Sequence, residues 1–167
     1  RACAVRRVRA VGRAAPGVAE VVRTGTPGGG APVLEVVGAV PALRHLVAEV
    51  RDRHGFSVRL RVTGDQVRLS AQDELTVYRV AQEALSNVVR HAKATHARVD
   101  LHFGQQVVLT VTDDGCGIPA PGITLASTGG HLGLIGMRER VDQVGGSLEV
   151  RAHTPHGTLV RATVQGT

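Results

Sequence analysis

Residues 107–117 read Val-Val-Leu-Thr-Val-Thr-Asp-Asp-Gly-Cys-Gly, an apolar and β-branched run that ends in two carboxylates and a glycine cluster. The apolar run is typical of a buried strand. Asp113 at its end could accept a hydrogen bond from an exocyclic amine, and Gly115 and Gly117 would let a flat ligand approach the backbone. An ordinary turn after a strand has the same residues, so this stretch alone leaves both interpretations open.

A second glycine cluster, Gly-Gly-His-Leu-Gly-Leu-Ile-Gly, occupies residues 129–136 and leads into a helical pattern over about 131–144. Free backbone N–H groups and the positive end of the dipole at such a helix start favour phosphate. The glycines concerned are Gly130, Gly133 and Gly136. A tight packing turn would have the same pattern, and His131 could either touch a phosphate or simply be exposed.

The longest predicted helix covers about 71–93 and begins after Ser70, which together with Asp73 resembles a capping box. Glu83 and Asn87 are one turn apart on this helix, so their side chains can converge on a single ligand. An Asn oxygen suits a hard cation such as Mg²⁺, and a Glu can orient or deprotonate a water. A solvated helix face is the alternative. The predicted apolar stripe consists of Val77, Ala81, Ala84, Leu85, Val88 and Ala92, with Arg79, Glu83, Asn87 and Arg90 nearly opposite.

Strands and helices alternate along the rest of the chain. Strands are predicted over about 33–37, 57–62, 97–103, 106–112, 147–153 and 158–164, and a helix from Pro41 to about Gly55. A loop is predicted over residues 115–130. The basic, glycine-rich stretch 1–31 is predicted to be an appendage and linker that precedes a domain over 32–167. Adjacent hairpins within this interleaved pattern predict a two-layer α/β sandwich, with a mixed sheet and helices on one face.

The composition of the 167 residues narrows the class of protein. The length fits one domain, and the core must be aliphatic because Phe56, Tyr78 and Phe103 are the only aromatics. Much of the net charge of +6 comes from arginines near the N-terminus, so we expect no nucleic-acid partner. Cys3 and Cys116 cannot form a disulfide framework and no pair has zinc-ligand spacing, which favours a reducing compartment. No apolar run reaches the ~18 residues of a membrane span, so we expect a soluble, cytoplasmic chain, which could also be the cytoplasmic portion of a membrane-bound protein.

In order and spacing, these motifs resemble those of the GHKL ATPases, the family of DNA gyrase, MutL and the histidine kinases. Residues 78–92 are similar to the family's N box, 113–117 to its G1 box and 130–141 to its G2 box. Within these motifs, three short sequences are most similar to those of the NarX/DesK-like sensor histidine kinases of bacteria: Gln-Glu-Ala-Leu, Arg-His-Ala and Gly-Met-Arg-Glu-Arg-Val. The resemblance covers about residues 41–165.

The resemblance implies a Bergerat-fold pocket for ATP and Mg²⁺. In it Asp113 would hold the adenine amine, Asn87 would coordinate Mg²⁺, and Glu83 would act with Asn87 in catalysis, holding the metal through water. The other implied nucleotide-binding residues are Arg90, His91 and Lys93 near the phosphates, Gly115, Gly117 and Ile118 beside the base, Gly130, His131, Leu132, Gly133 and Leu134 around the phosphates, and Thr158. The segment 118–132 would form a lid.

The resemblance also implies an activity. The domain would supply the γ-phosphoryl of Mg-ATP to a histidine on a dimerisation domain, for relay to a response regulator. None of the eight histidines is followed by Asp or Glu, as the phosphoacceptor of this subfamily is, so we expect that histidine outside this chain. An anti-sigma-type serine kinase and a regulator that binds nucleotide without turnover remain as alternatives.

Overall fold

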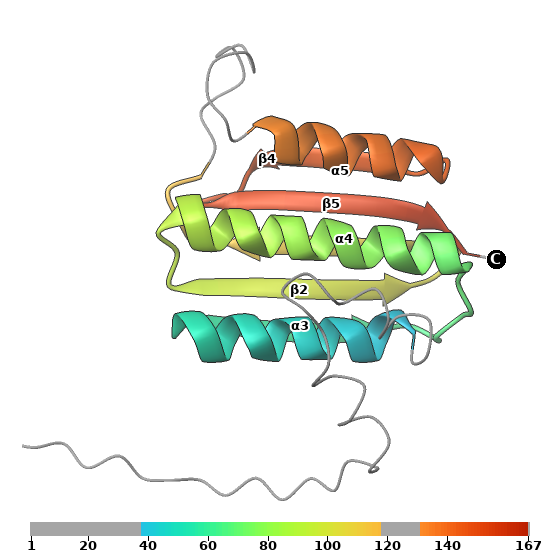
Figure 1. Ribbon diagram of the computed structural model, residues 1–167, viewed down its shortest axis with the longest axis horizontal. Coiled ribbons are helices and arrows are strands. Elements are labelled where there is room, and N and C mark those ends of the chain that lie inside the picture. The colour runs from blue at the N-terminus through green and yellow to red at the C-terminus, as the bar shows by residue number, and fades with distance from the viewer. Residues whose placement is uncertain (1–37, 118–130, 167) are drawn as a thin grey trace, which may run out of the picture.

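The computed structural model describes residues 38–117 and 131–166 (Figure 1). In chain order the elements are α3 (Ala39–His54), β1 (Ser57–Thr63), α4 (Ala71–Asn87), the π-helical η1 (Val88–Ala92), β2 (His96–Phe103), β3 (Gln106–Asp113), α5 (His131–Gln143), β4 (Ser147–Ala152) and β5 (Thr158–Gln165). The strand predicted over 33–37 and the appendage over 1–31 lie outside the described residues, as does most of the predicted loop. Of the helices in the described ranges, none combines the length and apolar character that crossing a bilayer requires.

The five strands form one mixed sheet in the order β1-β2-β3-β5-β4. β1 and β2 are parallel, and the other neighbouring strands are antiparallel. α3, α4 and α5 lie side by side on one face of this sheet (Figure 1). The predicted two-layer α/β sandwich is therefore confirmed.

The core lies between the helices and the sheet. In β2, Ala97, Val99, Leu101 and Phe103 are buried, whereas His96, Arg98 and His102 are exposed and Asp100 is half-buried. This alternation follows from the two-residue period of a strand, which turns one set of side chains toward the helices. The apolar stripe predicted for the helix over 71–93 is buried along its whole length, in α4 and in the π-helical η1, so each layer supplies one apolar face to a common core.

The helix predicted over 71–93 is confirmed at its start and modified at its end. Ser70 accepts a hydrogen bond from the Asp73 backbone N–H at 3.1 Å, as an N-cap residue does. The α-helical geometry ends at Asn87 and a π-helical turn continues to Ala92, after which Lys93 adopts the left-handed conformation at φ 51°. Single π-helical turns of this kind are frequent at functional sites.

Candidate functional site

A cavity of about 140 Å³ lies between the end of α4 and the sheet. Its helical wall consists of Ala84, Asn87, Val88, His91 and Ala92, its sheet wall of Val111, Asp113, Val150, Thr158 and Val160, and Gly117 and Leu134 complete it. Most of these side chains are apolar. Ligand pockets commonly measure about 300 Å³ or more, so this cavity has room for one part of a nucleotide-sized ligand.

Asp113 is the carboxylate in this apolar cavity, and it is 6% exposed. Its Oδ1 accepts a hydrogen bond from the Gly115 N–H at 2.8 Å, and its Oδ2 accepts one from the Thr158 N–H at 3.3 Å. It forms no ion pair with any described residue. Because an ionised carboxylate has about four acceptor sites, Asp113 retains capacity for a hydrogen-bond donor inside the cavity.

Gly157 brings the turn between β4 and β5 against Asp113. It has φ +105°, and a Cβ there would overlap the Asp113 carbonyl oxygen and lie 2.6 Å from its carbonyl carbon. Only a glycine avoids this overlap, because it has no Cβ. The close approach places the Thr158 N–H within reach of the Asp113 carboxylate.

Asn87 and His91 both line the cavity, because residues one helical turn apart share a helix face. Glu83, one turn before Asn87, lies beside the first turn of α5, where a Cβ on Gly133 would overlap its Oε1. No group of three His, Cys, Asp or Glu side chains in the described ranges could hold a metal by itself.

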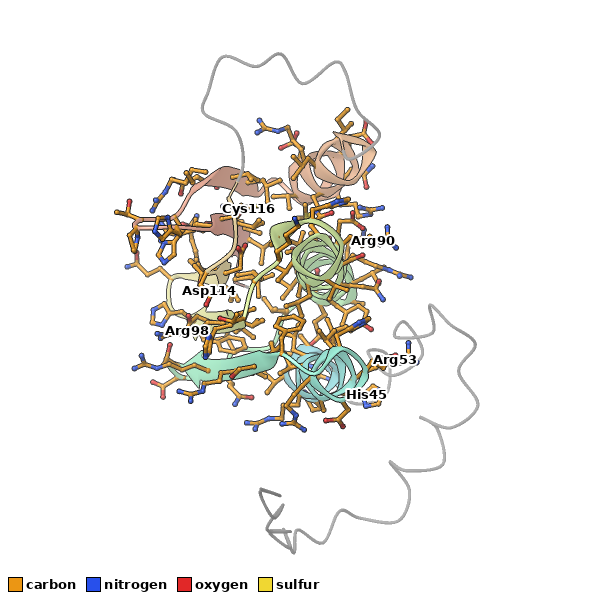
Figure 2. The ribbon with its side chains drawn as sticks, turned by 90° about the vertical axis from the view of Figure 1, so that its left-hand side faces the viewer. His45, Arg53, Arg90, Arg98, Asp114 and Cys116 are labelled. Carbon is orange, nitrogen blue, oxygen red and sulfur yellow. The ribbon has the colours of Figure 1, made fainter. Side chains whose placement is uncertain are left out.

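Arg90 does not line the cavity, and its expected place near the phosphates stays a prediction. Arg90 lines a groove between α3 and α4 together with Glu49 and Arg53. In Figure 2, Arg53 and Arg90 point outward on the helical side, away from the sheet. The reason is helical periodicity: Arg90 follows Ser86, which lines the same groove, by one turn.

The remaining predicted site residues fall into three groups. Gly117, Leu134 and Thr158 line the cavity, whereas Gly115 is buried next to Ala92 without lining it, and Lys93 is exposed after the end of η1. Ile118 and Gly130 lie outside the described residues, and so do the side chains of His131 and Leu132 at the start of α5. The sequence interpretation missed the valines of the sheet wall, Val111, Val150 and Val160, which strand alternation could have identified as inward-facing.

Comparison with known proteins gives matches to one family. The family model described as histidine kinase-, DNA gyrase B- and HSP90-like ATPase matches residues 72–167. The chain is 41% identical over 129 residues to the sensor histidine kinase NarS of Mycobacterium tuberculosis, covering 77% of this chain and 29% of NarS. It is 33% identical over 127 residues to the nitrate/nitrite sensor protein NarX of Escherichia coli, covering 75% of this chain and 21% of NarX. The chain thus spans less than a third of either relative.

The mycobacterial sensor histidine kinase MprB has a similar fold, with a TM-score of 0.55 at 24% sequence identity over 74% of this chain and 93% of the MprB structure. At that identity the likeness concerns the fold alone. The sequence matches go further, because the family model covers more than half of the chain, including the helix of Asn87 and the strand end of Asp113. The chain belongs to the family of histidine kinase-, DNA gyrase B- and HSP90-like ATPases.

Proposed function

We propose that the cavity binds the adenine end of ATP and that Asp113 accepts a hydrogen bond from the exocyclic amine. The observation that carries this proposal is a buried carboxylate with unused acceptor capacity in an otherwise apolar cavity. Such a group is costly to bury without partners, and a donor from the ligand would offset that cost. The apolar walls would enclose the flat base without the aromatic stacking that this chain lacks.

Asn87 is the proposed Mg²⁺ ligand, with Glu83 one turn away as its partner. Asn87 lines the cavity and offers an amide oxygen, which suits a hard cation. When bound, Mg²⁺ would neutralise charge on the phosphates. Glu83, beside the first turn of α5, would orient the attacking group or accept a proton from it, and His91 would face the phosphate end.

The proposed activity is transfer of the γ-phosphoryl group to a histidine on a dimerisation domain, followed by relay to a response regulator. Two findings support it: the family is an ATPase family, and the relatives NarS and NarX are a sensor histidine kinase and a nitrate/nitrite sensor. The chain would act in the cytoplasm. Phosphoryl transfer requires mainly positioning and charge stabilisation, which is what a rigid cavity wall can supply.

Calorimetric titration with a non-hydrolysable ATP analogue, with and without Mg²⁺, tests the binding proposal. We expect binding that strengthens with Mg²⁺ and that falls at least tenfold in Asp113→Asn, because one charge-assisted hydrogen bond is lost. Asp100→Asn is the matched control, since Asp100 pairs with Arg98 on the other face of the sheet. A folded wild-type chain that binds no analogue would refute the proposal.

Phosphotransfer is tested by adding γ-labelled ATP and a separate dimerisation domain that carries a phosphoacceptor histidine. The expected product loses its label in acid, because a phosphohistidine N–P bond hydrolyses there. An acid-stable phosphoserine product would favour the serine-kinase alternative. Nucleotide binding without transfer to any acceptor would instead favour a regulator that does not turn over.

A further inference from the structure

Asp114, the residue after the proposed adenine ligand, forms a concentrated set of hydrogen bonds on the other face of the sheet. Its Oδ1 accepts from the backbone N–H groups of Thr95 and His96, both at 2.8 Å. Its Oδ2 accepts from the Thr95 hydroxyl at 2.6 Å and lies 3.0 Å from Nδ1 of His96. Both oxygens of this partly exposed carboxylate therefore hold the same short segment.

That segment leads from the helical wall of the cavity into β2, the strand that pairs with β3. Thr95 lies between the π-helical turn η1, which ends the Asn87 helix, and strand β2, which begins at His96. Asp114 comes directly after Asp113 at the end of β3, and its own N–H donates to the His96 carbonyl at 3.2 Å. The next residue but one, Cys116, donates its N–H to the Ala92 carbonyl at 2.8 Å. The chain at the end of β3 is thus joined both to the start of β2 and to the end of η1.

The strand period explains how two adjacent carboxylates serve different faces. Asp113 points into the cavity among the helices, and Asp114 points to the opposite side. Figure 2 shows Asp114 on the sheet side of the molecule, like Arg98 and opposite Arg53 and Arg90. Asp114 therefore has no direct access to a ligand in the cavity.

We propose that Asp114 is a positioning residue, which sets the position of the Asp113 carboxylate relative to Asn87 and His91 by tying the end of β3 to Thr95 and His96 at the start of β2. A hydrogen bond from the Thr95 hydroxyl, followed by that from the His96 backbone, holds the pKa of the Asp114 carboxyl far below its usual value. The carboxylate remains ionised at neutral pH, and its bonds to N–H and O–H groups are charge-assisted. This inference rests on the proposed function, because it assigns Asp114 a role through Asp113.

The test is base selectivity, measured as the ratio of the affinities for ATP and inosine triphosphate, in which a carbonyl oxygen replaces the exocyclic amine. A change that only lowers stability weakens both affinities equally, because the unfolded chain binds neither nucleotide. Displacement of the Asp113 carboxylate weakens the affinity for ATP more than the affinity for inosine triphosphate. We expect Asp114→Ala to lower the ratio roughly tenfold, the order expected when a hydrogen bond to a charged group is misaligned.

Asp100→Ala is the matched control, because it removes a carboxylate from the same sheet face and should leave the ratio unchanged. Thr95→Val removes one of the four bonds and should lower the ratio less than Asp114→Ala does. Together the two substitutions should have less than the sum of their separate effects. If Asp114→Ala does not fold, the affinity ratio of Thr95→Val alone tests the inference. A wild-type ratio in folded Asp114→Ala or Thr95→Val overturns the inference.

The failure of the proposed function has a different outcome. If the wild-type protein does not bind ATP more tightly than inosine triphosphate, or if Asp113→Asn keeps this preference, then Asp113 does not recognise the exocyclic amine. The positioning role of Asp114 is then refuted as well. If Asp113→Asn abolishes the preference and Asp114→Ala retains it, the proposed function stands and only the positioning role is wrong.

Discussion

Replacing Gly157 with alanine should damage the fold and the cavity together. The residue has φ +105°, and an added Cβ would overlap the backbone carbonyl oxygen of Asp113. Holding an L residue at a sparsely populated positive φ costs about 1–3 kcal/mol. Displacing packed backbone costs about 1–3 kcal/mol more. The free energy of unfolding should therefore fall by about 2–6 kcal/mol, out of the ~5–15 kcal/mol typical of a domain.

Gly145→Ala is the control that separates the two contributions. Gly145 also has a positive φ, +66°, but nothing lies within 4 Å of the position of its added Cβ. Its replacement should cost only about 1–2 kcal/mol of left-handed strain. The smaller entropy of the unfolded alanine chain affects both variants alike and cancels in their difference.

Urea denaturation followed by circular dichroism gives the free energy of unfolding of both variants. The ATP-analogue titration then measures the second effect, a loss of affinity in folded Gly157→Ala that Gly145→Ala should not show. The reason is that relief of the overlap must move Asp113. If Gly157→Ala is no less stable than Gly145→Ala and binds as the wild type does, the close approach of the two chain segments is wrong.

Three further changes test other parts of the site and fold. Gly133→Ala should push the Glu83 carboxylate aside and lower the phosphotransfer rate more than the affinity for ATP. Gly136→Ala is the control and should change neither, because the atoms nearest to its added Cβ belong to the flexible Arg140 side chain. Equal phosphotransfer rates in the two variants would contradict this prediction. Ser70→Ala should lower the free energy of unfolding by about 1 kcal/mol in urea titrations, because α4 loses its N-cap, and an unchanged value would remove that role. Because the folded-state pKa of Asp114 is lowered, its stabilising effect is present above the usual Asp pKa of about 3.9 and declines as the pH falls below it. The difference in unfolding free energy between wild type and Asp114→Asn should therefore be smaller at pH 3 than at pH 7, and a constant difference would contradict the assignment.

The order of elements could be predicted from the sequence because the signals are local. The run over 57–62 alternates between apolar and polar side chains, and the structure has β1 there. Ser70 and Asp73 mark the start of the longest helix, and its buried stripe follows the helical period. The spacing of Asn87, Asp113 and the glycine clusters indicates the family from the sequence alone, and the match to the family model over residues 72–167 confirms that prediction.

The placement of single side chains required the tertiary structure. Arg90 is three residues from Asn87, close enough in sequence to suggest a shared site. In the structure it lines the groove against α3 and not the cavity, because the packing of the two helices determines which side of α4 is covered. The bonds of Asp114 to Thr95 and His96, 19 and 18 residues earlier in the chain, cannot be predicted from any local pattern either.

The sequence by itself determined the α/β pattern and the aliphatic core, and it indicated the residues that we propose to bind a nucleotide, because periodicity and residue type act within a few positions of the chain. The tertiary structure alone decided that Asp113 is buried against the Thr158 N–H, that Gly157 must lack a side chain, and that Asp114 ties β3 to the turn after η1. Each of these depends on chain segments that are distant in sequence and meet only when the sheet forms, so only the folded chain could show them.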